Sequence, residues 1–267
     1  SRVLLVAKSA HRQGESAYVL HSHAWSESSL ILELLTRDHG RVVAVAKGAK
    51  RPYSQLRPVL MPFQHLHVAF GAKRTAETEV WLLRNAEWAG GAAWPGGAAL
   101  LPGFYLNELL MRLTARHDPH PALFDAYAHT LQAMGEPSLL QAALRAFELI
   151  LLRELGHLPD LSQETVSHAT VLSGQTYELH PQLGVVPARW VGDEDAGPVV
   201  LDGAVLSSME QILSAPTIAY ASAIPALMAV CMPALVELKT ILRSLIHYHL
   251  GSQTLRTRQL MMELQQP

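Results

Sequence analysis

The sequence predicts an α+β protein with a five-stranded β-barrel at its N-terminus and a mainly α-helical domain after it. Apolar runs of strand length recur before residue 90, whereas later apolar residues recur every three or four positions, as in helices. Between the two patterns lies AGGAAWPGGAALLPG, residues 89–103, which is uncharged and rich in Gly, Ala and Pro, a composition typical of a linker. We therefore predict one domain at 1–90 and a second at 91–267.

The predicted strands of the first domain are separated by recognisable turns. The second and third are joined by RDHG, Arg37 to Gly40, a short connection that predicts a hairpin. A long polar loop separates the third strand from the fourth. Five strands in about 75 residues fit a small closed or partly closed barrel better than a sandwich. The expected strands are 15–23, 28–36, 41–46, 62–71 and 77–87.

The clearest helix is predicted within residues 137–156, because an apolar stripe recurs there at spacings of three and four. Ser138 followed by Gln141 predicts a capping box at its start, and Gly156 is placed to end it. Residues 157–200 are rich in Pro, Gly and Ser without a clear period, and we expect an irregular insertion. The other expected helices are 100–116, 120–134, 204–214 and 233–250.

Composition narrows the class of protein. The single cysteine, Cys231, excludes both an internal disulfide and a zinc site built from several thiolates, which fits a reducing compartment. It lies in an apolar segment, so we expect a buried structural thiol. The first residues have too short an apolar run for a signal peptide, and no segment reaches about 18 uninterrupted apolar residues. We expect a cytoplasmic protein without a membrane partner.

The net charge of −2 conceals an asymmetry between the two parts. Residues 1–90 contain 12 Lys or Arg against 7 Asp or Glu, a net charge of +5, whereas residues 91–267 contain 9 against 16, a net charge of −7. A basic first third predicts contact with a polyanion there.

The stretch RVVAVAKGAKRPYSQLRPVL, residues 41–60, joins a predicted strand to a cationic loop without an acid. Barrels of the oligonucleotide-binding (OB) type present such loops to single-stranded nucleic acid, where cations contact phosphates and aromatic rings stack on bases. Gly48 would let the backbone approach closely. The candidate nucleic-acid-binding residues are Arg41, Lys47, Lys50, Arg51, Tyr53 and Arg57, with Lys73, Arg74, Arg256 and Arg258 as further candidates.

Signatures of catalysis are scarce. The chain has no phosphate-binding loop ending in Gly-Lys-Ser/Thr, no H-E-x-x-H and no G-x-S-x-G, so we expect no catalytic residues. His21 and His23 share a strand face, as do His65 and His67, and together they could bind a metal if the two strands were neighbours. Surface or rim histidines are the simpler interpretation. We therefore expect no metal and no cofactor.

Several motifs in order resemble the RecO recombination-mediator family. TRDHGR at 36–41, KGAKR at 47–51 and LRPVLMPF at 56–63 resemble its N-terminal domain, while FELILLRELG at 147–156 and LGSQTLRTR at 250–258 resemble later segments. The resemblance covers nearly the whole chain. Many members carry four zinc-binding cysteines in the central insertion. Here there are none, and His157, His168 and His180 do not replace a thiolate cluster, so we expect no structural zinc. Thr257 stands where Ser is common in the family.

The resemblance implies a non-enzymatic bacterial DNA repair protein, associated with the nucleoid. Family members bind single- and double-stranded DNA, anneal complementary strands, and act with RecR to load RecA onto DNA coated by single-stranded DNA-binding protein. They also recognise the acidic, hydrophobic C-terminal tail of that protein. From the residues alone, an RNA-binding OB-fold adaptor without a recombination role and a metalloenzyme built on the paired histidines remain alternatives.

The resemblance also requires a peptide site in the acidic helical part. Such a site needs an apolar groove for the apolar side chains of the tail, with a cation at its rim to pair with the carboxylates. Arg145 and Arg153 are eight residues apart on the clearest helix and therefore flank one side of it, about 80° apart. We expect at least one of them to contact the tail. The further candidates are Arg112, Arg116 and Arg189.

Overall fold

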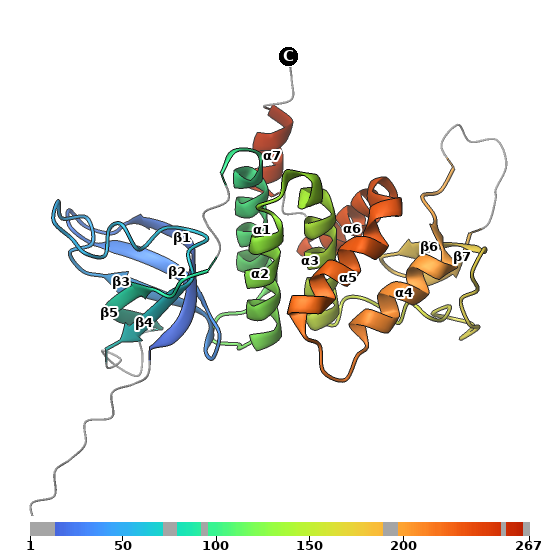
Figure 1. The fold of residues 1–267 in the computed structure, drawn as a ribbon, viewed down its shortest axis with the longest axis horizontal. Helices are drawn as coiled ribbons and strands as arrows, with labels where there is room; N and C mark the ends of the chain where they lie inside the picture. Colours follow the sequence, from blue (N-terminus) through green and yellow to red (C-terminus); the bar gives the residue numbers. More distant parts are fainter. Residues whose placement is uncertain (1–13, 72–78, 92–95, 189–196, 252–254, 264–267) are drawn as a thin grey trace, which may run out of the picture.

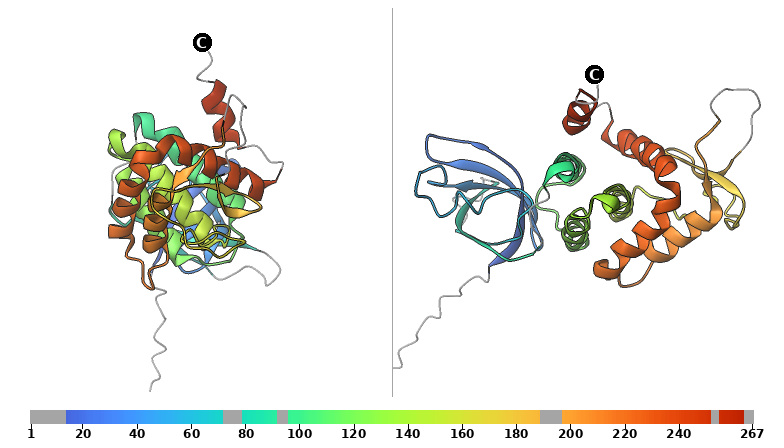
Figure 2. Two further views of the ribbon diagram at one scale, coloured as in Figure 1. Left: turned by 90° about the vertical axis from the view of Figure 1, so that its right-hand side faces the viewer. Right: turned by 45° about the horizontal axis from the view of Figure 1, so that its top comes forward.

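The computed structural model describes residues 14–71, 79–91, 96–188, 197–251 and 255–263. A β-barrel, a group of helices and a small sheet follow one another along the longest axis of the molecule (Figures 1 and 2). The predicted α+β class is confirmed, with the barrel formed by the N-terminal part of the chain.

The barrel is closed, with strand order β1-β2-β3-β5-β4. Neighbouring strands are antiparallel except β3 and β5, and the β1–β4 pair completes the closure. The RDHG segment forms the predicted β2–β3 hairpin turn. The fourth strand starts later than predicted, because Phe63 has a left-handed φ of 68° that interrupts an extended run. The strands are β1 Glu15–Ala24, β2 Leu30–Thr36, β3 Gly40–Ala46, β4 Leu66–Phe70 and β5 Val80–Trp88.

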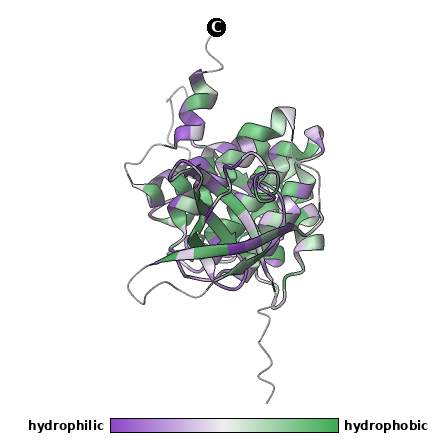
Figure 3. Cartoon of the chain, turned by 90° about the vertical axis from the view of Figure 1, so that its left-hand side faces the viewer, coloured by the Kyte–Doolittle hydropathy of each residue, from purple (hydrophilic) through white to green (hydrophobic). Residues whose placement is uncertain are grey.

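The barrel has its own apolar core. Leu32 and Leu34 on β2 and Val42 and Ala44 on β3 are inaccessible to solvent. Hydrophobic and hydrophilic segments are interspersed along the barrel end of the ribbon (Figure 3). Because alternate residues of a strand point to opposite faces, only one face of each strand lines this core.

The helical part is built around α3, most of whose residues are buried. Residues 220–231 form α5, which was not predicted because it is apolar on nearly every face and contains Pro225, so that no helical period stands out. The short, polar α7 was also missed. The helices are α1 Leu100–Leu113, α2 Pro121–Ala133, α3 Leu140–Glu154, α4 Gly203–Leu213, α5 Tyr220–Cys231, α6 Leu235–Leu250 and α7 Arg256–Glu263.

The prediction for the C-terminal end of α3 is confirmed, and the prediction for its N-terminal end is wrong. Gly156 follows the helix with a left-handed φ of 74°, as expected for a residue that terminates it. The capping box is wrong. The carboxylate of Glu136 accepts hydrogen bonds from the Ser138 backbone N–H and hydroxyl, and a 3-10 turn that begins at Pro137 precedes α3.

The insertion is less irregular than predicted. It contains β6 Thr176–His180 and β7 Gly184–Pro187, which form a three-stranded sheet of order β7-β6-β8 with β8 Leu201–Asp202. These strands have two to five residues each, too few to show an alternating pattern in sequence. Asp202 then caps α4 by accepting a hydrogen bond from the backbone N–H of Ala204 at 2.7 Å.

Specific contacts fix the barrel to the helices. The Asn107 side chain of α1 donates to the carbonyl oxygen of Leu20 at 3.1 Å and accepts from the Tyr127 hydroxyl of α2. Arg37, in the β2–β3 turn, donates two hydrogen bonds of 2.9 Å to the carboxylate of Asp125. The paired polar groups and the bidentate geometry orient the barrel on α1 and α2.

One segment, Tyr220–Leu250, is long and apolar enough by composition to cross a membrane. In this structure it is two helices, α5 and α6, separated by a 3-10 turn that contains Pro233. Ile224, Leu227 and Leu238 from this segment are buried in the core of the helical part. Part of its hydrophobicity is therefore used within the fold, where 39% of its most apolar stretch is buried.

Candidate DNA-binding loops and a cationic pocket

Two loops meet at the end of the barrel that faces away from the helices (Figure 1). They are the β1–β2 connection, residues 25–29, and the first part of the β3–β4 loop, residues 47–57. The backbone N–H of Lys50 donates to the carbonyl oxygen of Ser28 at 3.0 Å, and its ammonium donates to that of Ser26 at 2.9 Å. Lys50 thus joins the two loops into one surface, which we call the distal loop surface.

The distal loop surface offers cations to solvent. Lys47, Arg51 and Arg57 are exposed and form no ion pair with any residue that the structure describes. Gly48 has a left-handed φ of 70°, a conformation that glycine adopts readily. A Cβ at this position would lie 3.6 Å from the Arg51 side chain, an ordinary contact, so the conformation and not lack of space favours glycine here. Unpaired cations on a fixed turn are suited to phosphate groups.

Two aromatic rings accompany these cations. Tyr53 is 95% exposed and lies in a shallow groove with Pro52, Pro58 and Met61. Trp25 in the β1–β2 connection is 64% exposed and was missed from the sequence. The available signal was a Trp inside the polar turn that precedes a strand, but only the Lys50 contacts show that this turn lies beside the cationic loop.

Arg41 has a different environment from the loop cations. Its side chain is only 12% exposed, donates to Glu33 at 2.9 Å and also donates to the carbonyl oxygen of Thr114 at 2.9 Å. Arg116 pairs with the same Glu33 carboxylate. The structure therefore places Arg41 and Arg116 at the junction of the barrel and the helices. Lys73 and Arg74 lie outside the described residues.

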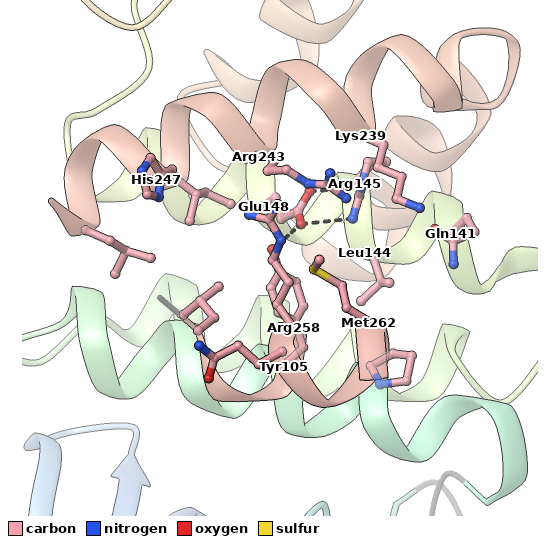
Figure 4. Close-up of a pocket in the computed structure, with 15 residues that line it drawn as sticks. Tyr105, Gln141, Leu144, Arg145, Glu148, Lys239, Arg243, His247, Arg258 and Met262 are labelled. Atoms are coloured by element: carbon pink, nitrogen blue, oxygen red, sulfur yellow. Dashed lines mark hydrogen bonds and ion pairs between the residues drawn. The ribbon is translucent and has the colours of Figure 1, made fainter. Parts of the chain in front are cut away.

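A pocket of about 570 Å³ lies among α1, α3, α6 and α7 (Figure 4). Its wall combines apolar side chains with cations from three helices, opposed by one carboxylate, Glu148. The wall is therefore positively charged whatever the protonation state of Glu148. The apolar residues are Leu144, Ile246, Leu250, Leu255 and Met262, and the cations are Arg145, Lys239, Arg243 and Arg258.

A buried ion pair lies at the base of this pocket. The Arg145 Nε lies 2.8 Å from Glu148 Oε2, and Nη2 donates to Oε1 at 2.9 Å. The Tyr105 hydroxyl donates to the same carboxylate at 2.6 Å. Complete burial raises the pKa of the Glu148 carboxyl above its ordinary value, while the Arg145 guanidinium and the Tyr105 hydroxyl oppose that rise. The two contacts with Glu148 hold the Arg145 side chain in one orientation.

The other arginines considered for the peptide site lie elsewhere. Arg153 forms an ion pair with Glu210 and donates to the carbonyl oxygen of Pro159, on a different side of α3 from the pocket. Arg112 pairs with Glu108 on α1. Arg189 lies outside the described residues. Of the pair predicted on α3, only Arg145 therefore lines the pocket, and Arg258, considered for DNA, joins it there.

The paired histidines are not assembled into one cluster. His67 lies opposite Ser16 on β1, and His21 is five residues further along that strand, roughly 16 Å at the rise of a strand. His157 stacks on His249 at 3.9 Å between ring centroids. Within the described ranges, no group of three or more His, Cys, Asp or Glu could hold a metal ion.

Cys231 is buried, as predicted. Burial raises the pKa of its thiol to about 12, so the nucleophilic thiolate is not populated at neutral pH.

These observations define a class: an α+β protein whose N-terminal OB-like barrel carries an exposed cationic loop and whose helical part carries a cationic, apolar pocket. The family models described as "Recombination protein O N terminal" and "Recombination protein O C terminal" match residues 11–89 and 97–259.

Proteins of the same family are similar over nearly the full length. The "DNA repair protein RecO" of Polaromonas sp. is 49% identical over 253 residues, covering 94% of this chain and 96% of its own. The protein of the same name from Variovorax paradoxus is 46% identical over 265 residues, covering 96% and 98%. The chain belongs to the RecO family of DNA repair proteins.

Proposed function

We propose that this protein is a recombination mediator that binds single- and double-stranded DNA at the distal loop surface and anneals complementary strands. With RecR, it would load RecA onto DNA coated by single-stranded DNA-binding protein. The proposal assigns no catalytic step and no cofactor to the chain, and it expects a cytoplasmic, nucleoid-associated protein. Family membership supports a role in DNA repair and favours DNA over the RNA-binding alternative.

The observation that carries the DNA-binding proposal is the composition and exposure of the distal loop surface. Lys47 and Arg51 are free to follow phosphates, and Trp25 and Tyr53 offer exposed faces on which bases can stack. Stacking requires unpaired bases, whereas the cations can contact any strand. The same surface can therefore hold single strands by both interactions and duplex mainly by charge.

We further propose that the pocket takes the acidic, apolar tail of single-stranded DNA-binding protein. The net charge of −7 in residues 91–267 makes this part of the molecule a poor general partner for anions. The pocket is a local exception, because cations surround an apolar cavity. Arg145 can contribute charge there, and Leu144 and Ile246 can contact apolar side chains of the tail. The division at 1–90 and 91–267 would then separate DNA binding from protein binding.

The DNA-binding proposal is tested by salt dependence. Each phosphate contact releases counterions and contributes about 0.7 to the log–log slope of affinity against salt for single strands, about 0.9 for duplex. The variant carrying Lys47→Ala, Lys50→Ala and Arg51→Ala should bind single strands more weakly, with a slope reduced by roughly two units. Binding is measured by fluorescence anisotropy at several salt concentrations. Arg84→Ala, an exposed cation on β5, is the matched control and should keep the parental slope.

A triple variant with parental slope and parental circular dichroism would move the DNA site away from the distal loop surface. Lys73, Arg74 and Arg256 would be the next cations to replace. In a competition with RNA of matched sequence, a clear preference for RNA would instead favour the adaptor alternative.

The peptide proposal is tested with a labelled peptide in which acidic residues precede an apolar carboxyl terminus. Arg243→Ala and Lys239→Ala remove exposed cations of α6 from the pocket wall without breaking the buried Arg145–Glu148 pair, and each should weaken binding. Arg256→Ala removes an exposed cation that does not line the pocket and should bind as the parent does. Equal binding by all three variants would place the tail elsewhere.

A further inference from the structure

The short helix α7 has little reason to be helical by itself. It contains eight residues, and isolated helices shorter than about 12 residues are marginal in water. Much of its surface is exposed, including Leu260 and Met262. It stands beside α1 at one edge of the helical part, away from the small sheet (Figures 1 and 2). A contact with α1 must therefore fix its position.

Glu108 on α1 supplies that contact. Its carboxylate accepts hydrogen bonds from the backbone N–H groups of Arg256 and Thr257 at 2.8 and 2.9 Å, and from the Thr257 hydroxyl at 2.7 Å. The N–H groups of a first helical turn have no partner within their own helix, so a carboxylate there both satisfies them and complements the helix dipole. Three bonds from one side chain fix where α7 begins.

The buried carboxylate of Glu108 depends on these hydrogen bonds. The residue is only 7% exposed, and a buried carboxylate is costly unless it is paired and hydrogen-bonded. Burial by itself would raise its pKa, but the hydrogen bonds from Thr257 and Arg256, together with the Arg112 guanidinium, lower the pKa below its ordinary value. The carboxylate is therefore the form that holds α7.

Docking of α7 completes one wall of the pocket. Leu255, Arg258, Gln259 and Met262 line the pocket, and the Arg258 and Met262 side chains project towards Arg145 and Glu148 (Figure 4). Without α7, the pocket would lose one of its four cations, Arg258, and one of its apolar residues, Met262. Arg256, two positions before Arg258, does not line it.

We propose that α7 is part of the peptide site and that Glu108 is the positioning residue that holds Arg258 and Met262 in the pocket wall. The ligand is an acidic peptide with an apolar carboxyl terminus, whose carboxylate pairs with Arg258 and whose apolar side chain packs on Met262. This inference rests on the peptide-binding role proposed above. It assigns Arg258 to protein recognition rather than to DNA.

The first experiment compares pairs of variants that differ in one hydrogen bond or one position. Thr257→Val removes the hydroxyl that Glu108 accepts, whereas Thr257→Ser keeps it. The Val variant should bind the labelled peptide about threefold more weakly, and the Ser variant should match the parent. Glu108→Gln should weaken binding about tenfold. Arg258→Ala should weaken it, and Arg256→Ala should not.

A second experiment separates positioning from a general loss of structure. In a background that carries Arg258→Ala and Met262→Ala, Thr257→Val should cause no further loss of peptide affinity, because the side chains that it positions are already gone. An equal loss in both backgrounds would overturn the positioning role. Peptide addition should also slow hydrogen exchange of the α7 backbone amides, and unchanged exchange would contradict contact with α7.

The outcomes distinguish this inference from the role on which it rests. If the parent binds the acidic peptide and loses it with Arg243→Ala, but not with Glu108→Gln or Arg258→Ala, the pocket is correct and the assignment of α7 is wrong. If the parent binds the peptide no better than a version with Asn in place of its acidic residues, the peptide-binding role itself fails, and the assignment of α7 fails with it.

Discussion

The two cationic regions of the molecule use the same residue types in opposite ways. On the distal loop surface, Lys47 and Arg51 lie in a loop and are exposed to solvent. Neither forms an ion pair within the described part of the chain. In the pocket, Arg145 is 6% exposed and already paired with Glu148 on a buried helix. The first arrangement suits the proposed long polyanion, which could bind in many registers. The second presents a fixed charge beside apolar side chains and so suits a short segment with both features.

The comparison shows that cations of the same type lie in two different environments. Exposed cations lose little when they change position, and their contacts with phosphate are screened by salt. A buried cation has lost its hydration and depends on its partner carboxylate, so its removal affects folding as well as binding. Substitutions in the pocket should therefore affect both folding stability and binding, whereas substitutions on the distal loop surface should affect binding alone. The predicted effects range from large to none.

The largest effect is expected from Arg145→Ala. This change leaves the Glu148 carboxylate buried without its guanidinium, and removing one partner of a buried ion pair typically costs about 3–5 kcal/mol of unfolding free energy. Replacing both residues with apolar side chains, Arg145→Met with Glu148→Leu, should recover much of that loss. Urea unfolding measures all three chains. Lys47→Ala, the matched change on the distal loop surface, should leave the unfolding free energy within about 0.5 kcal/mol of the parent.

If Arg145→Ala proved as stable as Lys47→Ala, the contrast between a buried and an exposed cation would be lost.

The next largest effect concerns stacking at the distal loop surface. Trp25→Ala and Tyr53→Ala should each weaken binding of single-stranded DNA by about 1–3 kcal/mol, the range for one stacked base, while duplex binding changes little. Anisotropy titrations with a single strand and its duplex provide the measurement. Trp88→Ala is the control, because this Trp is equally exposed, at 64%, but belongs to β5 and not to either loop of the distal loop surface. Equal losses on duplex and single strand would show that the rings act through loop structure and not through stacking.

A smaller effect is expected from pH at Glu108. Because the folded-state pKa of this carboxyl is lowered, its stabilising contribution is present above the ordinary value of 4.5 and is lost as the pH falls from there through the folded-state pKa. Hydrogen exchange of the α7 amides, corrected for the intrinsic effect of pH, should therefore accelerate in that acidic range relative to the α3 amides. Glu108→Gln should exchange rapidly at every pH. A parental chain with the same α7 protection on both sides of this range would contradict the anchoring role.

No effect is expected from metal removal in either region. The insertion lacks cysteine, so no folding free energy should be stored in thiolate–zinc bonds. A strong chelator should leave the thermal unfolding midpoint unchanged, and elemental analysis of the purified chain should find no stoichiometric zinc. Stoichiometric zinc would refute this prediction and return attention to His157, His168 and His180.

The sequence determined the parts of the fold that are regular over many residues. Apolar runs of strand length, separated by the RDHG turn, predicted β2 and β3. The stripe through Leu144 and Leu151 predicted α3 because a helix brings every third or fourth residue to one face. The cationic loop was visible for the same local reason, since its charges are neighbours in the chain. Short or uniformly apolar elements, such as β7 and α5, have no such period and were missed.

The tertiary structure determines where each charged side chain lies and which group it pairs with. Arg145 and Arg153 look equivalent on one helix, but Glu148 holds the first in a pocket and Glu210 holds the second outside it. Arg41 belongs to the cationic stretch in sequence, yet Glu33 draws it into the domain junction. The partner of Arg153, Glu210, is 57 residues away along the chain, and such a partner becomes known only when the helices are packed together. The hydrogen bonds that the backbone N–H groups of Arg256 and Thr257 donate to Glu108 span 148 and 149 residues, and they decide where the last helix lies.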